Sequence, residues 1–295
     1  MEKKKIKLLS PKIDIVFQKL FGEVGNEKIT KSFLQSILKE KIQKVDLSKN
    51  PILKRETMND KMGILDIIVE INNQEKCNVE LQVIAKENIK ERILFYWSKL
   101  YARGIKQGED YEKLSKTIEI LIADFKIEGL EGLRYHSRWK IKEEEKEIVL
   151  TDKLEIHIIE LPKVKETGGK REDLLDWLYF IENPGDERVI KNMEKNEGLR
   201  EAKEKLEVMS DDEYMQRIAE WREKAIRDEK ELLNTGYHKG MKEGMKEGMK
   251  EGMKQGEKEK RKEIQRIAKK LKEENMTLEQ ISKITELTIE EIEKL

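Results

Sequence analysis

Residues 65–83, LDIIVEINNQEKCNVELQV, predict the β-hairpin around which this chain folds. Two runs rich in Ile and Val, 64–71 and 78–84, flank the turn-forming segment NNQEK, as expected for paired strands. Asp66 lies near the start of the first run, and Glu80 and Gln82 lie in the second. Because acids are rarely buried without a partner, the hairpin is also the first place to look for a functional site.

The segments around the hairpin predict an α/β domain with a mixed sheet. The expected helices are 13–40, interrupted at Gly25 and Asn26, and 87–107, and the expected later strands are 117–123, 133–139 and 154–161. The run 117–123 (TIEILIA) is continuously apolar apart from one acid, a pattern typical of a strand covered on both faces. Helix, extended segment, hairpin, helix and strand in this order indicate an α/β domain.

Composition sets the number of segments that we expect. Of 295 residues, 41% are charged and 37% are hydrophobic, which is too polar for one globule over the full length. The hydrophobic fraction is nevertheless sufficient for one domain of about 150 residues, a usual domain size. We therefore expect an α/β domain in 1–165, a helical extension in 166–235, a Gly-Lys-Glu repeat in 236–262 and a small helical tail in 263–295.

The repeat GYHKGMKEGMKEGMKEGMKQG places a glycine at every fourth position from Gly236 to Gly256. Each glycine costs a helix roughly 1 kcal/mol relative to Ala, which favours a semi-flexible helical or disordered spacer. Small residues at this spacing also let two helices approach closely, so self-association through this region is an alternative. The Lys and Glu residues between the glycines exclude a membrane-embedded version.

The C-terminal residues predict three short helices, 263–274, 278–284 and 289–294. Thr277 with Gln280, and Thr288 with Glu291, have the spacing of capping boxes. The pattern resembles the small helix-turn-helix at the ends of resolvases. We favour a three-helix knob without a DNA role, because the candidate recognition helix TIEEIEKL is acidic and phosphates would repel it.

The cysteine, the histidines and the lengths of the apolar runs exclude several classes of protein. Cys77 is the single cysteine, expected in the hairpin turn, so no disulfide framework is predicted. His136, His157 and His238 are scattered without metal-binding spacing and are expected to be structural or exposed. No segment has the length of a signal peptide core or the ~18 apolar residues of a membrane span, which predicts a cytoplasmic chain without a membrane partner.

The spacing of the polar residues in the hairpin suits a metal ion. Residues two apart in a strand face the same side, so Glu80 and Gln82 project together, and Asp66 joins them if the register allows. Two carboxylates beside an amide suit Mg²⁺, which prefers oxygen ligands. The alternative, which spacing alone favours, has Glu80 facing solvent on an edge strand and Asp66 capping a turn.

The hairpin resembles the D-(x)n-E-x-K core of the PD-(D/E)xK nuclease superfamily. Two further segments narrow the resemblance: residues 13–22 (IDIVFQKLFG) and 91–114 (ERILFYWSKLYARGIKQGEDYEKL). Over roughly residues 8–165, the chain is similar to the PD-(D/E)xK nuclease family transposases, also called recombination-promoting nucleases. This resemblance implies a restriction-endonuclease-like mixed sheet flanked by helices, an α-helical C-terminal extension, and a Mg²⁺- or Mn²⁺-dependent DNA endonuclease.

The resemblance also assigns roles to individual residues. Asp66 and Glu80 match the metal-binding carboxylates, and Asp14 matches an acid that completes the site in many members. From the residues alone, Asp14 is equally well explained as a first-turn acid that stabilises its helix. Gln82 stands where the superfamily usually has Lys. An amide carries no charge, so we expect a slower enzyme, although E-x-Q recurs throughout this branch.

The helix after the hairpin offers a further contact to DNA. Arg92 and Tyr96 are four residues apart and share a helix face. Arg92 is the candidate for a DNA phosphate, and Tyr96 is expected to pack on the sheet. Two other functions remain open: a catalytically weak or inactive DNA- or protein-binding module that self-associates through its helical tail, and an oligomeric scaffold.

Overall fold

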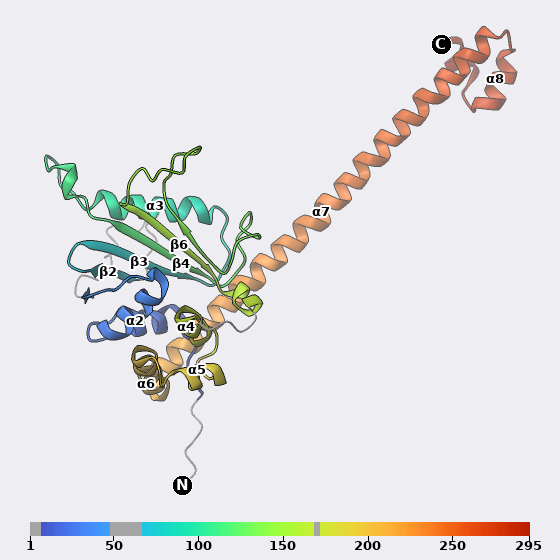
Figure 1. The fold of residues 1–295 in the computed structure, drawn as a ribbon. Coiled ribbons are helices and arrows are strands. Elements are labelled where there is room, and N and C mark those ends of the chain that lie inside the picture. Colours follow the sequence, from blue (N-terminus) through green and yellow to red (C-terminus); the bar gives the residue numbers. More distant parts are fainter. Residues whose placement is uncertain (1–6, 48–66, 168–171) are drawn as a thin grey trace. The chain divides into compact units, whose positions relative to one another are not determined.

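The computed structural model describes residues 7–47, 67–167 and 172–295 (Figure 1). The predicted extended segment from Pro51 and the predicted site residue Asp66 lie outside these described residues. The chain divides into two compact units, Met1–Arg227, called unit 1 below, and Asp228–Leu295, called unit 2. The core that contains the sheet also includes residues of the predicted helical extension, as far as Ala219.

The described strands of unit 1 form one mixed sheet, in the order β1-β2-β3-β4-β6-β5. They are β1 (Val45–Asp46), β2 (Ile67–Ile71), β3 (Glu75–Gln82), β4 (Thr117–Ala123), β5 (His136–Trp139) and β6 (Leu154–Glu160). β3, β4 and β6 are parallel, whereas β1, β2 and β5 pair antiparallel with their neighbours. All seven residues of β4 are buried, which confirms the strand predicted from TIEILIA.

β2 and β3 form the predicted hairpin, with Ile67 opposite Val79. Asn72 and Asn73 adopt left-handed conformations at the turn (φ 53° and 60°), which asparagine tolerates better than most residues. The prediction that Cys77 lies in the turn is wrong. The turn is shorter than NNQEK because β3 already begins at Glu75, so Cys77 pairs within the sheet and is fully buried.

Helices cover both faces of this sheet (Figure 1). They are α1 (Asp14–Phe21), α2 (Glu27–Leu38), α3 (Ile89–Ala102), α4 (Asp173–Glu182), α5 (Glu187–Asn192) and α6 (Glu197–Asp211), with short 3₁₀ segments at Tyr111–Lys113 and Leu161–Thr167. Cys77, Val79 and Leu81 of β3 share a large apolar cluster with α1, α2 and α4. Leu121 and Ala123 of β4 face the other way and pack with α3. This arrangement confirms the predicted α/β sheet flanked by helices.

A close approach between α2 and α6 gives a test of the packing on the first face. A Cβ atom on Gly198 of α6 would lie 2.4 Å from the Cβ of Ser32 in α2. We expect Gly198→Ala to lower the free energy of unfolding of unit 1 by about 1–3 kcal/mol, because the two helices must separate. Urea denaturation followed by tryptophan fluorescence measures this, since Trp97, Trp139, Trp177 and Trp221 all belong to unit 1.

Gly240→Ala provides the matched control in the repeat, because nothing lies within 4 Å of a Cβ added there. It is expected to leave the tryptophan transition unchanged and to stabilise its helix by roughly 1 kcal/mol. A Gly198→Ala protein as stable as the wild type would contradict the close packing of α2 against α6.

The predicted short helices 278–284 and 289–294 are confirmed, whereas the predicted helix 263–274 is not separate but forms the end of one long helix. α7 (Glu213–Glu273) begins in unit 1 and runs as one helix through the glycine repeat, and α8 (Leu278–Thr285) and α9 (Ile289–Glu293) follow it. Both predicted capping boxes form, at Thr277 and Thr288. Ala268, Ile281 and Ile292 are central to the small apolar core of unit 2. Among the described helices, none combines the length and apolar character needed to cross a membrane.

Candidate active site

Glu80 is a buried acid in the middle of the sheet. β3 lies between β2 and β4, and the side chain of Glu80 is 1% exposed. The expectation that Glu80 faces solvent on an edge strand is therefore wrong. Strand alternation sends Val79 and Leu81 to the α1–α2–α4 face, so that Glu80 and Gln82 project together toward α3, as predicted.

Two donors hold one oxygen of the Glu80 carboxylate. Its Oε1 accepts hydrogen bonds from Gln82 Nε2 at 2.5 Å and from an Arg92 terminal nitrogen at 2.7 Å. Its Oε2 is buried and has no hydrogen-bond partner within residues 7–47, 67–167 and 172–295. A buried carboxylate oxygen without a donor is costly, which makes this atom available to a cation.

Arg92 links Glu80 to the helix that covers it. The guanidinium of Arg92, whose side chain is 25% exposed, lies 4.9 Å from the centre of the Tyr96 ring. Tyr96 itself is buried, as predicted for a residue that packs on the sheet. The shared helix face of Arg92 and Tyr96 is thereby confirmed. In this structure Arg92 serves as the counter-charge of Glu80, at a position still open to solvent.

Asp14, the third predicted carboxylate, lies in the first turn of α1 with its side chain 51% exposed. Its Oδ1 accepts a hydrogen bond from the Ile15 N–H, and its Oδ2 lies 3.5 Å from Arg222 in α7. In the described part of the chain, no hydrogen bond or ion pair joins Asp14 to Glu80 or Gln82. These contacts fit a first-turn acid near the positive end of the helix dipole.

Sequence reasoning missed a second buried acid on the same face. Asn78 Nδ2 donates to Glu119 Oε1 at 2.6 Å, and both side chains are fully buried. Asn78 precedes Glu80 by two residues, so β3 carries a polar stripe of Asn78, Glu80 and Gln82 beneath α3. The period of two and the acid inside TIEILIA were the signals that could have identified this pair.

The chemistry of the donor set fits a hard divalent cation. Mg²⁺ and Mn²⁺ prefer carboxylate and amide oxygens, and Glu80 Oε2 offers such an oxygen in a buried position. Over the described residues, no three His, Cys, Asp or Glu side chains gather as a complete ligand set. Asp66, the second predicted carboxylate, directly precedes Ile67 in the sequence and lies outside the described residues.

A mixed sheet with helices on both faces, carrying Glu-x-Gln on the second strand of its hairpin, has the fold of the PD-(D/E)XK nucleases. A family model described as PD-(D/E)XK nuclease family transposase matches residues 11–236, and the chain belongs to this family. No curated protein and no solved structure matches the chain.

Proposed function

We propose that this protein is a metal-dependent DNA endonuclease of the recombination-promoting, transposase-like type. The observation that carries the proposal is Glu80 Oε2, a buried carboxylate oxygen without a described partner, in a chain of a nuclease family. Asp66 and Glu80 would hold Mg²⁺ or Mn²⁺. A divalent cation there supplies Lewis-acid stabilisation of the charge that develops on a phosphodiester.

Gln82 and Arg92 would act beside the cation. Gln82 already donates to Glu80 through Nε2, which leaves its amide carbonyl to accept a hydrogen bond from the attacking water. Arg92 has five N–H donors in a planar fork, and a guanidinium of this kind binds phosphate oxygens in pairs. A cation that neutralises Glu80 would free Arg92 for the DNA backbone.

Residues 1–165 would carry the chemistry, and the helical region after them would assemble the protein. We place the protein in the cytoplasm with DNA as its partner, and we assign self-association to the C-terminal helical region. The exposed Met241, Met245, Met249 and Met253 on α7 support an association surface there.

Plasmid cleavage tests the proposed function. Supercoiled plasmid is incubated with the full chain and Mg²⁺ or Mn²⁺, with and without chelator, beside the variant Asp66→Asn. We expect nicking by the wild type that the chelator abolishes and that the variant lacks. Equal nicking by the wild type and the Asp66→Asn variant would refute the proposed endonuclease activity.

A different outcome would support the alternative function of a DNA-binding module. An uncharged Gln82, together with the hydrogen bonds from Gln82 and Arg92 that occupy Glu80 Oε1, would suit such a catalytically weak protein. Its signature is salt-sensitive DNA binding without any nicking, because phosphate contacts release counterions.

A further inference from the structure

A further polar cluster lies at the β5 edge of the sheet, on β5 and β6. His157 Nε2 is 2.7 Å from Glu155 Oε1, and His157 Nδ1 is 2.8 Å from His136 Nε2. The two imidazole rings are stacked with centres 5.1 Å apart. His157 pairs in register with Ile120, whose side chain belongs to the α1–α2–α4 face. The cluster therefore lies on the opposite face of the sheet from Glu80.

Glu155, at the inner end of this cluster, is ionised. Arg138 Nε lies 2.6 Å from its Oε1, and Lys116 Nζ lies 3.2 Å from its Oε2. Burial raises the pKa of Glu155, but the hydrogen bonds from His157 and Arg138 and the charge of Lys116 outweigh burial and hold the pKa well below its usual value. The carboxylate is therefore an acceptor only.

An ionised Glu155 fixes the proton positions along the cluster. His157 donates through Nε2 to the carboxylate, and in the tautomer with its single proton on Nε2 the Nδ1 of His157 is an acceptor. His136 must then donate through Nε2, and its Nδ1 carries a lone pair. Within the described residues, this Nδ1 has no hydrogen-bond partner. His136 Nδ1 is thus a base that can take up a proton.

A cavity of about 210 Å³ adjoins His136. Its charged lining consists of Lys39, Arg134 and Arg138 against the single acid Glu172. The side chains of Lys39 and Arg134 are 67% and 65% exposed. Arg138 is already paired with Glu155 and Glu40, so Lys39 and Arg134 are the lining cations that favour an anion.

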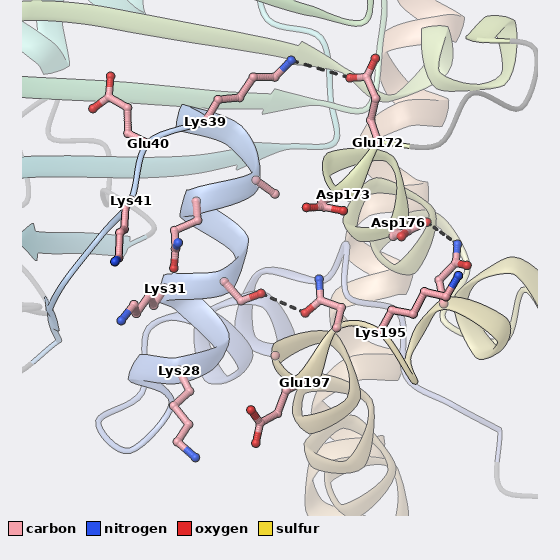
Figure 2. A pocket seen from close by; sticks show the side chains of 16 residues that line it. Lys28, Lys31, Lys39, Glu40, Lys41, Glu172, Asp173, Asp176, Lys195 and Glu197 are labelled. Atoms are coloured by element: carbon pink, nitrogen blue, oxygen red, sulfur yellow. Dashed lines mark hydrogen bonds and ion pairs between the residues drawn. The ribbon is translucent and has the colours of Figure 1, made fainter.

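Glu172 contacts Lys39 and Arg134 but leaves both cations with further N–H donors. It accepts from Tyr135 Oη at 2.8 Å and from Arg134 at 3.1 Å, and Lys39 Nζ lies 3.9 Å away. Figure 2 shows Lys39 reaching Glu172 at the rim of a neighbouring cavity of about 840 Å³, which both residues also line. Arg134 makes one such contact with its five donors, so it can bind a ligand as well.

We propose that this cavity binds a phosphate-type oxyanion, and that His136 takes up a proton as the anion binds. A proton on Nδ1 turns that atom into a donor to the anion. The resulting imidazolium still donates through Nε2 to His157, which still donates to Glu155, so no hydrogen bond has to reverse. The anion is either free phosphate or the terminal phosphate of a nucleic acid strand.

The charged surroundings of His136 set the direction of the pH dependence. The titratable and charged groups around it are Lys39 after α2, Arg134, Tyr135 and Arg138 at β5, Glu155 and His157 on β6, and Glu172 before α4. Two more groups lie behind these: Glu40 pairs with Arg138, and Lys116 pairs with Glu155. Burial, repulsion from His157 when that ring is also protonated, and the charges of Lys39 and Arg134 lower the pKa of His136 to about 4. A bound anion compensates those charges and raises this pKa, so binding tightens as the pH falls.

Imidazole NMR spectra of the full-length protein test the proposal, because the chain has only three histidines. Sulfate is the probe, since it remains a dianion across the pH range used. We expect saturable shifts of the His136 and His157 signals, while exposed His238 stays constant as an internal reference. The sulfate affinity should rise up to tenfold per pH unit between pH 7 and 5, the limit for uptake of one proton.

Variants separate this cavity from the candidate active site. His136→Gln should abolish the pH dependence, and Arg134→Gln, on an exposed side chain, should weaken sulfate binding about tenfold without affecting folding. Glu80→Gln should bind sulfate as the wild type does. Histidine signals that do not respond to sulfate, or an affinity that is the same at pH 5 and pH 7, would overturn the proposal.

Competition experiments distinguish the two sources of the anion. Displacement of sulfate by a 5′-phosphorylated oligonucleotide, but not by its unphosphorylated form, assigns the site to a nucleic acid end. Displacement by inorganic phosphate alone assigns it to the free ion. Failure of both to displace sulfate would refute a phosphate site.

Discussion

Replacing Glu80 by Gln is expected to lower divalent-metal-dependent DNA cleavage by about 100-fold or more. The amide keeps the shape of the side chain but removes the carboxylate charge, and with it the anionic Oε2 that would face the cation. Metal-based charge stabilisation is worth several kcal/mol, and about 1.4 kcal/mol corresponds to a factor of ten in rate. Initial rates of plasmid nicking at saturating Mg²⁺ and Mn²⁺ measure the effect.

Glu119→Gln is the matched control, because Glu119 is an equally buried acid on the same face of the sheet. It should retain most of the cleavage rate, whereas Glu80→Gln should also lose Mn²⁺ binding measured by calorimetry. Tryptophan fluorescence tests whether both variants are folded. If Glu119→Gln and Glu80→Gln lose activity equally, the loss reflects a general effect of buried acids, and the role assigned to Glu80 fails.

Lys163→Met is expected to destabilise unit 1 by about 3–5 kcal/mol, the usual effect of removing one partner from a buried ion pair. Lys163 is 4% exposed, and its Nζ donates to Glu160 Oε2 at 2.5 Å and to the Leu130 carbonyl at 2.6 Å. Methionine fills the space but leaves the Glu160 charge, itself 2% exposed, without its cation. Urea denaturation followed by tryptophan fluorescence measures the change in the free energy of unfolding.

Lys165→Met provides the comparison within the same 3₁₀ segment, since that side chain is 77% exposed. Its effect should stay within about 0.5 kcal/mol, as for most surface substitutions. The double variant Glu160→Gln/Lys163→Met should recover part of the lost stability, because no unpaired charge remains. Equal stability of the two lysine variants would show that the Glu160–Lys163 pair contributes little.

The sheet could be predicted from the sequence because the hydrophobic pattern of each strand is visible in its own residues. TIEILIA is apolar enough to require cover on both faces, and β4 occupies that central position. The alternation in β3 likewise placed Glu80 and Gln82 on one side. The position of β3 inside the sheet was not predictable, because strand order depends on connections that a single segment does not encode. The solvent-facing alternative for Glu80 failed for that reason.

The polar networks were harder to predict because they depend on pairing between distant strands. His136 and His157 are 21 residues apart, and only the antiparallel register of β5 against β6 brings their rings together. Glu119 meets Asn78 in the same way, through the parallel register of β3 and β4. Spacing along the chain contains neither relation, so the sequence predicts His136 and His157 only as separate residues.

The uninterrupted helix through the glycine repeat has a geometric consequence for anything that binds it. Four residues advance an α-helix by about 400°, or about 40° beyond one full turn. From Met241 to Met253, three repeats rotate the methionine positions by about 120° around the axis of α7. A partner that touches all four methionines must therefore wind around α7, and two copies of this helix in continuous contact would form a right-handed supercoil.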